Sequence, residues 1–317
     1  MNAFKSSWQH TLSHAVQGWG VGLHSGAAVC VTLQPMPVDS GLWLEHVPPA
    51  SPKRFFRLSP KTCRGGFMAT QAVAPGKGAG VEGVGTLEHL LAACHLVGLD
   101  NVNITVEGPE IPILDGGAWL WVQMLQTAGL VKQPSKRCLT RPTSKIRVEA
   151  AHGQAWLEAH PPLPGQEGVL SLSLTIDFPH EAIGRQRAFL VLGQRSASEP
   201  LLGTPPTQPK TMAASRTFVE RGAIVALQSS GRALGGSLAH ALVADESSGT
   251  VINPGGVRWG GQEFVHHKLL DLLGDLYTTG NAVRGRFEGF CSGHRLNGAL
   301  VQALAQQAPM WPTCTKM

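Results

Sequence analysis

The sequence has no CxxC pair among its six cysteines, no HExxH motif and a single tyrosine. A chain of 317 residues is too long to need a disulfide framework, so we expect the cysteines to be reduced thiols. The missing HExxH motif excludes the commonest metalloprotease helix. Lys and Arg are scattered without a run of five, so the formal net charge of +5 indicates a slightly basic surface and no nucleic-acid partner.

Long apolar runs are also absent. No segment approaches the ~18 apolar residues that a membrane span requires. The first ten residues carry one Lys and no apolar segment typical of a signal peptide. We therefore expect a cytoplasmic protein without stable membrane insertion. Charged residues make up only 15% of the chain and apolar residues 43%, which is typical of a globular protein with ample apolar surface for a core.

Three stretches rich in proline, glycine or polar residues interrupt the apolar patterning, at residues 48–85, 132–144 and 196–210. Such clusters between periodic segments are typical of loops or linkers. The second stretch lies near the middle of the chain and follows an expected helix. It predicts two domains, residues 1–135 and 136–317.

The segments between these stretches mix strand and helix patterns. Strands are predicted where β-branched residues cluster or apolar residues alternate, at residues 28–33, 101–106 and 170–178. Helices are predicted where apolar residues recur at helical spacing, at residues 87–96, 118–130, 262–277 and 296–306. Thr86 is the expected N-cap of the first helix. Neither half shows regular βαβ alternation, so the predicted fold class is α+β, with layers of sheet and helix.

The helix expected at residues 262–277 carries polar side chains of the kinds that bind metals. His267, Asp271 and Asp275 are spaced at i, i+4 and i+8 and form a stripe apart from the apolar face. A histidine and a carboxylate one turn apart can bind one divalent metal ion. The pattern alone is weak, because polar stripes are common on the solvent face of amphipathic helices.

Three shorter segments contain further candidates, each with an ordinary alternative. Glu88 and His89 at a helix start fit either a general base beside a metal ligand, or a capping carboxylate beside a surface imidazole. His294, in a glycine-containing turn, fits either a proton donor or a surface residue. The Thr217 hydroxyl fits either a hydrogen-bond donor to an oxyanion or an ordinary strand residue.

Short motifs that follow one another along most of the chain together resemble one family. They are GVGLHSG at residues 20–26, TLEHL at 86–90, PEIPILDG at 109–116, TIDF at 175–178, SRTF at 215–218, LGGS at 234–237, EFVHHKLLDLLGDL at 263–276 and SGHRLN at 292–297. The family is that of UDP-3-O-acyl-N-acetylglucosamine deacetylase, which acts at the committed step of lipid A synthesis in Gram-negative bacteria. Any one motif is weak, but the ordered set is specific.

The resemblance implies a zinc-dependent amide hydrolase that removes the N-acetyl group. The residues that would hold Zn²⁺ are His89, His267 and Asp271. The implied roles in catalysis are Glu88 as general base, His294 as general acid, Asp275 as the residue that orients or charge-stabilises this acid, and Thr217 as a stabiliser of the oxyanion. Two histidines and an aspartate would also suit Fe(II) or Co(II).

The resemblance also implies a small-molecule substrate, a UDP-linked acylated amino sugar. The positions carried over as substrate-binding are His24, Phe178, Phe218, Ile224, Gly236, Leu238, Val243 and Lys268. An insert of the second domain at about residues 218–243 would form an apolar passage for the acyl chain. Arg221 and Ala223 depart from the family's pattern in this insert.

The fold implied by the resemblance has two similar domains, each a two-layer α/β sandwich, with the metal site in the cleft between them. We expect the chain to be a monomer. Two other interpretations stay open at this point. Another zinc amidase or peptidase would use the same ligands without a preference for UDP or an acyl chain. A catalytically silent paralogue would bind acylated nucleotide sugars, but such a binder need not keep an acid and a base.

Overall fold

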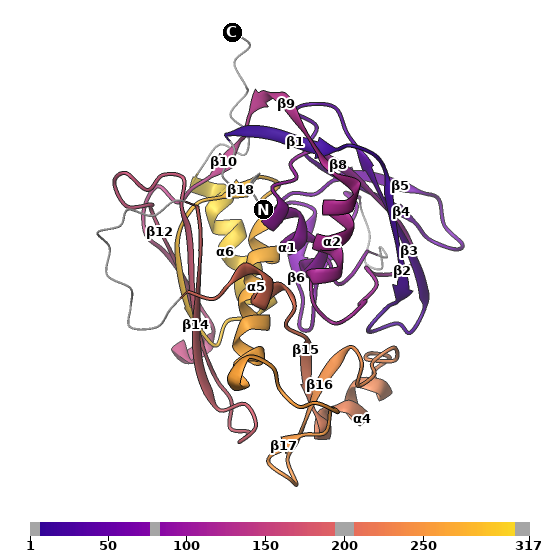
Figure 1. Ribbon diagram of the computed structural model, residues 1–317, viewed down its shortest axis with the longest axis vertical. Coiled ribbons are helices and arrows are strands. Elements are labelled where there is room, and N and C mark those ends of the chain that lie inside the picture. Colours follow the sequence, from indigo (N-terminus) through magenta and orange to yellow (C-terminus); the bar gives the residue numbers. More distant parts are fainter. Residues whose placement is uncertain (1–6, 77–82, 194–205, 308–317) are drawn as a thin grey trace.

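Two five-stranded sheets lie on the outside of the protein, with helices between them (Figure 1). The computed structural model describes residues 7–76, 83–193 and 206–307. Parts of two expected loops, residues 77–82 and 196–205, lie outside the described residues. Within the described residues, no helix has both the length and the apolar character needed to cross a membrane.

The first sheet is built from the first half of the chain. Its strands in spatial order are β2 (Val16–Val21), β3 (Ala28–Pro35), β8 (Val102–Glu107), β4 (Leu42–Val47) and β5 (Arg54–Arg57). β8 and β4 are parallel, and all other neighbours are antiparallel. The helices of this half are α1 (Glu88–Val97) and α2 (Trp119–Ala128). They cover the inner face, where alternate residues of β4 such as Leu42 and Leu44 are fully buried.

The second sheet repeats this plan with the second half of the chain. Its strands in spatial order are β11 (Ile146–Glu149), β12 (Trp156–His160), β19 (Gly285–Phe290), β13 (Leu170–Asp177) and β14 (Arg185–Leu192). The one parallel pair of this sheet, β19 with β13, has the same place in the order. The helices of this half are α5 (Glu263–Tyr277) and α6 (His294–Gln307), and they lie on the inner face.

The two units share one topology. Each runs through four strands, a helix, a fifth strand that enters the middle of the sheet, and a second helix. The prediction of two similar sheet-plus-helix domains is therefore confirmed. The predicted boundary between residues 135 and 136 falls within β9 (Leu130–Lys136) and stays a prediction.

Each unit carries an insert at the same point, between its fourth strand and its first helix. The first insert contains a hairpin of β6 (Cys63–Gly65) and β7 (Thr70–Ala72). The second insert contains α3 (Pro209–Ala213), β15 (Thr217–Glu220), α4 (Arg221–Ser229), β16 (Ala241–Asp245) and β17 (Thr250–Val251). The strands of the second insert form a separate three-stranded sheet, which projects at the bottom of Figure 1.

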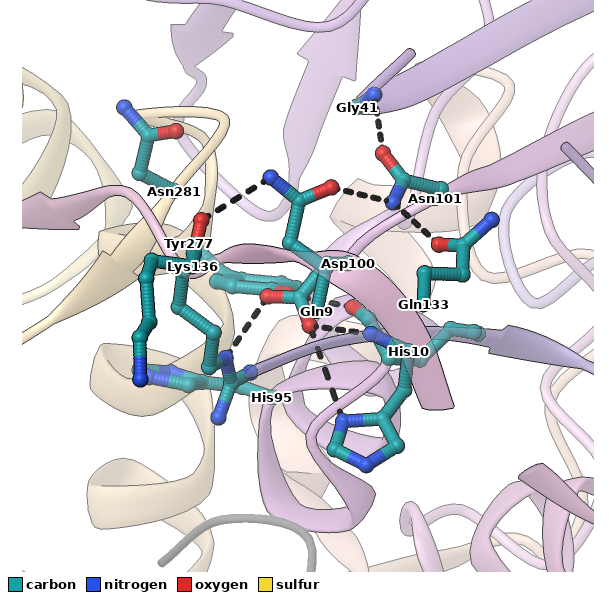
Figure 2. A network of polar contacts seen from close by, with 12 residues as sticks. Gln9, His10, Gly41, His95, Asp100, Asn101, Gln133, Lys136, Tyr277 and Asn281 are labelled. Atoms are coloured by element: carbon teal, nitrogen blue, oxygen red, sulfur yellow. Dashed lines mark hydrogen bonds and ion pairs between the residues drawn. The ribbon is translucent and has the colours of Figure 1, made fainter. Parts of the chain in front are cut away.

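A buried polar network fixes the strands that lead from one unit to the other (Figure 2). β1 (Trp8–Leu12) pairs with β9, and β10 (Leu139–Thr140) pairs with β18 (Ala282–Val283) of the second unit. Asn101, 1% exposed, donates hydrogen bonds to the side-chain oxygens of Gln9 at 2.8 Å and Gln133 at 2.6 Å. The guanidinium of Arg137 donates to Asp100 at 2.8 Å. Because these buried groups are hydrogen-bonded, the network sets how β1 and β9 lie against the start of β8.

The two units meet where α1 packs on α5. Gly274 of α5 lies so close to α1 that a Cβ atom there would be 1.9 Å from the carbonyl oxygen of Glu88. Further along the crossing, the rings of His95 and Tyr277 stack with their centroids 4.5 Å apart. The Tyr277 hydroxyl also donates to the carbonyl oxygen of Leu99 at 2.5 Å. A residue without a side chain is therefore needed at position 274 for the helices to reach this separation.

Several local expectations were wrong. α1 begins at Glu88 with Leu87 at its N-cap, and the Thr86 hydroxyl donates instead to Glu110 at 2.8 Å. Helix α6 begins at His294, two residues earlier than expected, so His294 lies in the first turn of a helix. The stretches expected as loops at 48–85 and 132–144 contain short strands, β5 to β7 and β9 to β10, because strand pairing takes up their backbone hydrogen bonds. β6 and β7 pair with each other, whereas β5, β9 and β10 pair with strands outside these stretches.

Replacing Gly274 with alanine is expected to destabilise the protein. Alanine is favoured over glycine inside a helix by about 1 kcal/mol. A methyl group this close to a backbone oxygen would force the two helices apart, and overpacking of this kind costs about 1–3 kcal/mol or more. We expect a lower free energy of unfolding in urea for Gly274→Ala. Gly168→Ala is the matched control, because no atom lies within 4 Å of its Cβ position. Wild-type stability in Gly274→Ala would contradict a tight crossing.

Candidate active site

Three side chains from the two units converge beside the crossing of α1 and α5. His89 lies in the first turn of α1, and His267 and Asp271 lie one turn apart on α5. The Nε2 atoms of His267 and His89 are 3.4 Å and 3.6 Å from Oδ1 of Asp271. All three side chains are buried, with exposures of 2–4%. The polar stripe of α5 is thus covered by α1, and its polar groups form a buried cluster.

The surroundings hold these groups in the protonation states that a metal requires. Nδ1 of His267 donates to the carbonyl oxygen of Ser215 at 3.0 Å, which leaves the Nε2 lone pair directed at Asp271. Burial lowers the pKa of His267 to about 4, so its imidazole is neutral near pH 7. Burial would raise the pKa of Asp271, but the ammonium of Lys268 at 2.8 Å and the neighbouring His267 outweigh burial and hold this pKa well below its usual range.

The donor set fits a single divalent cation. Oδ1 of Asp271 is buried and has no hydrogen-bond partner among the described residues. The ligand atoms of the three residues lie within 4.8 Å of one another. Bonds of 2.0–2.1 Å to a tetrahedral zinc ion place its ligand atoms about 3.3 Å apart, close to the two separations from Asp271. His89, His267 and Asp271 could therefore hold a metal with little rearrangement, and we call them the metal triad.

A second buried cluster adjoins the metal triad and consists of Glu88, Asp275 and His294. Nδ1 of His294 donates to Oδ2 of Asp275 at 2.8 Å, and its Nε2 lies 3.7 Å from Oδ2 of Asp271. Burial alone would lower the pKa of His294, but the facing carboxylates, Asp275 foremost, outweigh burial and raise it to about 9. Near neutral pH His294 is therefore an imidazolium that can donate a proton.

Glu88 has the properties of a buried base. It is 3% exposed, and burial raises the pKa of its carboxyl group. One carboxylate oxygen, Oε2, accepts a hydrogen bond from the backbone amide of Thr70 at 2.9 Å. Glu88 and its neighbour His89 reach this position because α1 starts at the crossing. We call Glu88, Asp275 and His294 the acid–base cluster.

An apolar cavity of about 280 Å³ lies under the second insert. Most of its lining residues come from β15, α4 and β16 with the loop before it, and the first unit contributes Leu23, His24 and Met68. Of the residues predicted to bind substrate or stabilise the oxyanion, the cavity is lined by His24, Thr217, Phe218, Ile224, Gly236, Leu238 and Val243. Phe178 does not line it but packs edge-on against Phe218, with ring centroids 5.5 Å apart. Lys268 instead contacts Asp271.

Glu110 organises one wall of this region, and the sequence analysis missed it. The Glu110 carboxylate holds the loop that carries His24. It accepts hydrogen bonds from the backbone amides of His24 and Ser25 and from the Thr86 hydroxyl. A Cβ at Gly22 would lie 2.3 Å from the same carboxylate. Glu110 is part of the PEIPILDG motif, but nothing within that motif shows that its side chain binds the backbone of a loop 86 positions away.

A buried ion pair that the sequence analysis also missed fixes the second insert on α5. The guanidinium of Arg216 donates to Glu263 at 2.8 Å and 3.0 Å, and the Arg216 backbone amide donates to the same carboxylate at 3.0 Å. Arg216 stands between Ser215, whose carbonyl orients His267, and Thr217 at the cavity wall. The pair thus sets the position of both neighbours relative to the metal triad.

Comparison with known proteins agrees with the motifs. The model of the UDP-3-O-acyl N-acetylglycosamine deacetylase family matches residues 9–306. Proteins named UDP-3-O-acyl-N-acetylglucosamine deacetylase from Shewanella denitrificans (strain OS217) and Shewanella halifaxensis (strain HAW-EB4) are each 37% identical to this chain. The one from Shewanella loihica (strain PV-4) is 36% identical. Each alignment spans 304 residues, 96% of this chain and 92% of the relative. The chain therefore belongs to the UDP-3-O-acyl N-acetylglycosamine deacetylase family.

Proposed function

We propose that the protein hydrolyses the acetamide of UDP-3-O-acyl-N-acetylglucosamine, releasing acetate and the free amino sugar nucleotide for lipid A synthesis. The observation that carries this proposal is the metal triad in contact with a buried acid–base cluster, beside an apolar cavity. Membership of the family supports the choice of substrate. A general amidase would not need the cavity.

We propose that His89, His267 and Asp271 hold a zinc ion. When bound, zinc would supply a Lewis acid that polarises the amide carbonyl and lowers the pKa of a bound water. The neutral imidazole of His267 and the ionised carboxylate of Asp271 are the forms that bind such an ion. The monomeric state stays a prediction.

The acid–base cluster would divide the proton transfers between two residues. Glu88 takes a proton from the water that attacks the acetyl carbonyl. Burial raises the pKa of its carboxyl group and so makes the carboxylate a stronger base. Thr217 donates a hydrogen bond to the developing oxyanion. His294 gives its proton to the sugar nitrogen as the C–N bond breaks, so that nitrogen leaves as a neutral amine. Asp275, bonded to the other ring nitrogen of His294, stabilises the imidazolium until that step.

Substrate binding would use the rest of the predicted residues. We propose that the cavity formed by Phe218, Ile224, Gly236, Leu238 and Val243 takes the acyl chain, since these residues leave an apolar space. We propose that the other predicted residues, His24, Phe178 and Lys268, contact the UDP-sugar portion. Arg221, the departure noted in the insert, lines the cavity, and its guanidinium donates to Asp245 at 3.0 Å. The cytoplasmic location stays a prediction.

Glu88→Gln is expected to abolish most of the turnover. The amide cannot accept the proton of water, and loss of a general base typically costs about 10²- to 10⁴-fold. Acetate release from UDP-3-O-acyl-N-acetylglucosamine is the measurement, with bound metal determined in the same samples. Glu149→Gln, at an exposed position of β11, is the control and should keep full activity. No release by the wild-type protein across acyl lengths would refute the proposed reaction and leave a silent binder or a different amide substrate.

His267→Ala is expected to weaken metal binding by at least about tenfold, because it removes one of three protein ligands. Metal content after dialysis against a weak chelator measures this directly and does not require activity. His266→Ala is the matched control, since His266 is the buried neighbour on α5 that lies outside the metal triad. Equal metal retention by the two variants would exclude this triad as the metal site.

Asp275→Asn is expected to move the alkaline limb of the pH profile of kcat/KM to lower pH. The negative charge of Asp275 helps to raise the pKa of His294 to about 9, and the proposed acid works only while protonated. Without that charge, the pKa falls and the proton is lost at lower pH, by roughly one pH unit or more. An alkaline limb that does not move in Asp275→Asn would show that His294 is not the group that sets it.

A further inference from the structure

Thr70 lies where the first insert meets the acid–base cluster. It is the first residue of β7, pairs with Gly65 of β6 and is 2% exposed. Gly65 lies so close to the start of α6 that a Cβ atom at position 65 would be 1.7 Å from the carbonyl oxygen of His294. The first insert thus reaches across to the second unit at the proposed general acid.

The polar groups of Thr70 all bond to residues in or next to the acid–base cluster. Its backbone amide donates to Oε2 of Glu88 at 2.9 Å. Its carbonyl oxygen accepts from the backbone amide of Leu87 at 3.2 Å. Its hydroxyl donates to Oδ1 of Asp275 at 2.5 Å. One residue of the first insert therefore contacts the proposed base through its backbone and the partner of the proposed acid through its side chain.

The hydroxyl of Thr70 completes the hydrogen bonding of Asp275. Oδ2 of Asp275 accepts from Nδ1 of His294 and from Nδ2 of Asn297, both at 2.8 Å. With Thr70 on Oδ1, donors on both oxygens fix the plane of the carboxylate. Asp275 is 1% exposed, so bulk water does not replace a missing donor. Loss of the hydroxyl would leave a buried carboxylate oxygen unsatisfied and allow the carboxylate to rotate away from His294.

We propose that Thr70 is a positioning residue that sets the orientation of Asp275, and through it His294, relative to Glu88. This inference rests on the proposed function, because Glu88 and His294 are the base and acid of that reaction. Thr70 belongs neither to the metal triad nor to the lining of the cavity. Loss of its hydroxyl should therefore lower kcat and leave KM and bound metal unchanged.

Thr70→Val tests the proposal, because valine keeps the β-branched shape and the backbone amide and removes only the hydroxyl. We expect kcat to fall by about 10- to 100-fold, which is the loss seen when the hydrogen-bond partner that orients a functional side chain is removed. KM and metal content should stay within about twofold of wild type. Thr70→Ser, which restores the hydroxyl, should recover most of kcat. If Thr70→Val does not fold, Thr70→Ala gives the same comparison with a smaller side chain.

Thr62→Val is the matched control from the same insert. It also removes a buried hydroxyl, one that donates to the carbonyl oxygen of Arg57 at 2.7 Å, away from the acid–base cluster. We expect its kcat to equal that of wild type. A second comparison adds Thr70→Val to Asp275→Asn, where it should cost little more than Asp275→Asn alone, because the two residues act through one hydrogen bond.

The outcomes separate the two proposals. Undiminished kcat in Thr70→Val beside an active wild-type protein overturns the role of Thr70 alone. A fall in kcat matched by a loss of metal, or a full additive loss in the double variant, also overturns it, because Thr70 would then act on the fold or the metal and not through Asp275. A wild-type protein that releases no acetate overturns the proposed function, and this role with it.

Discussion

The close crossing of α1 and α5 is the constraint on which the rest of the site depends. Glu88 and His89 open α1 where Gly274 of α5 allows the backbones to touch. His267 and Asp271 face them from α5, so each cluster takes residues from both units. Neither unit alone contains a complete set of ligands or a complete acid–base set. The separation of two helices therefore decides whether any of the chemistry is possible.

Two buried histidines that lie close together have pKa values shifted in opposite directions. His267 faces one carboxylate and a neighbouring ammonium, and desolvation lowers its pKa to about 4. His294 is buried almost as deeply but faces three carboxylates, and its pKa rises to about 9. One imidazole is thus kept neutral and the other charged by the count of negative groups around each. Their different chemistry follows from the way the helices bring Asp271 and Asp275 to them.

The sequence predicted the long helices well, but it predicted few of the strands and few of the contacts. Apolar periodicity placed α5 within one residue of its observed start, and alternation located β13. Periodicity cannot show that a second helix covers the polar stripe of α5, so the burial of Asp271 was not foreseen. The contacts of Thr70 with Asp275 span 205 positions, and no local pattern encodes them. The grouping of His89 with His267 came from the family resemblance, because only the fold brings them together.

The inserts occupy equivalent points of the two units, yet they have diverged in what they contribute. The first insert has a short hairpin that contacts the acid–base cluster, whereas the larger second insert lines most of the apolar cavity. The two contributions overlap, because the second insert also carries Ser215, whose carbonyl oxygen orients His267, and Thr217. If the cavity takes the acyl chain as proposed, mutations confined to α4 would alter which lipid tails fit without displacing Thr70 or the residues around it. A lineage would then be able to change the tails it processes while Thr70 and the acid–base cluster are inherited intact.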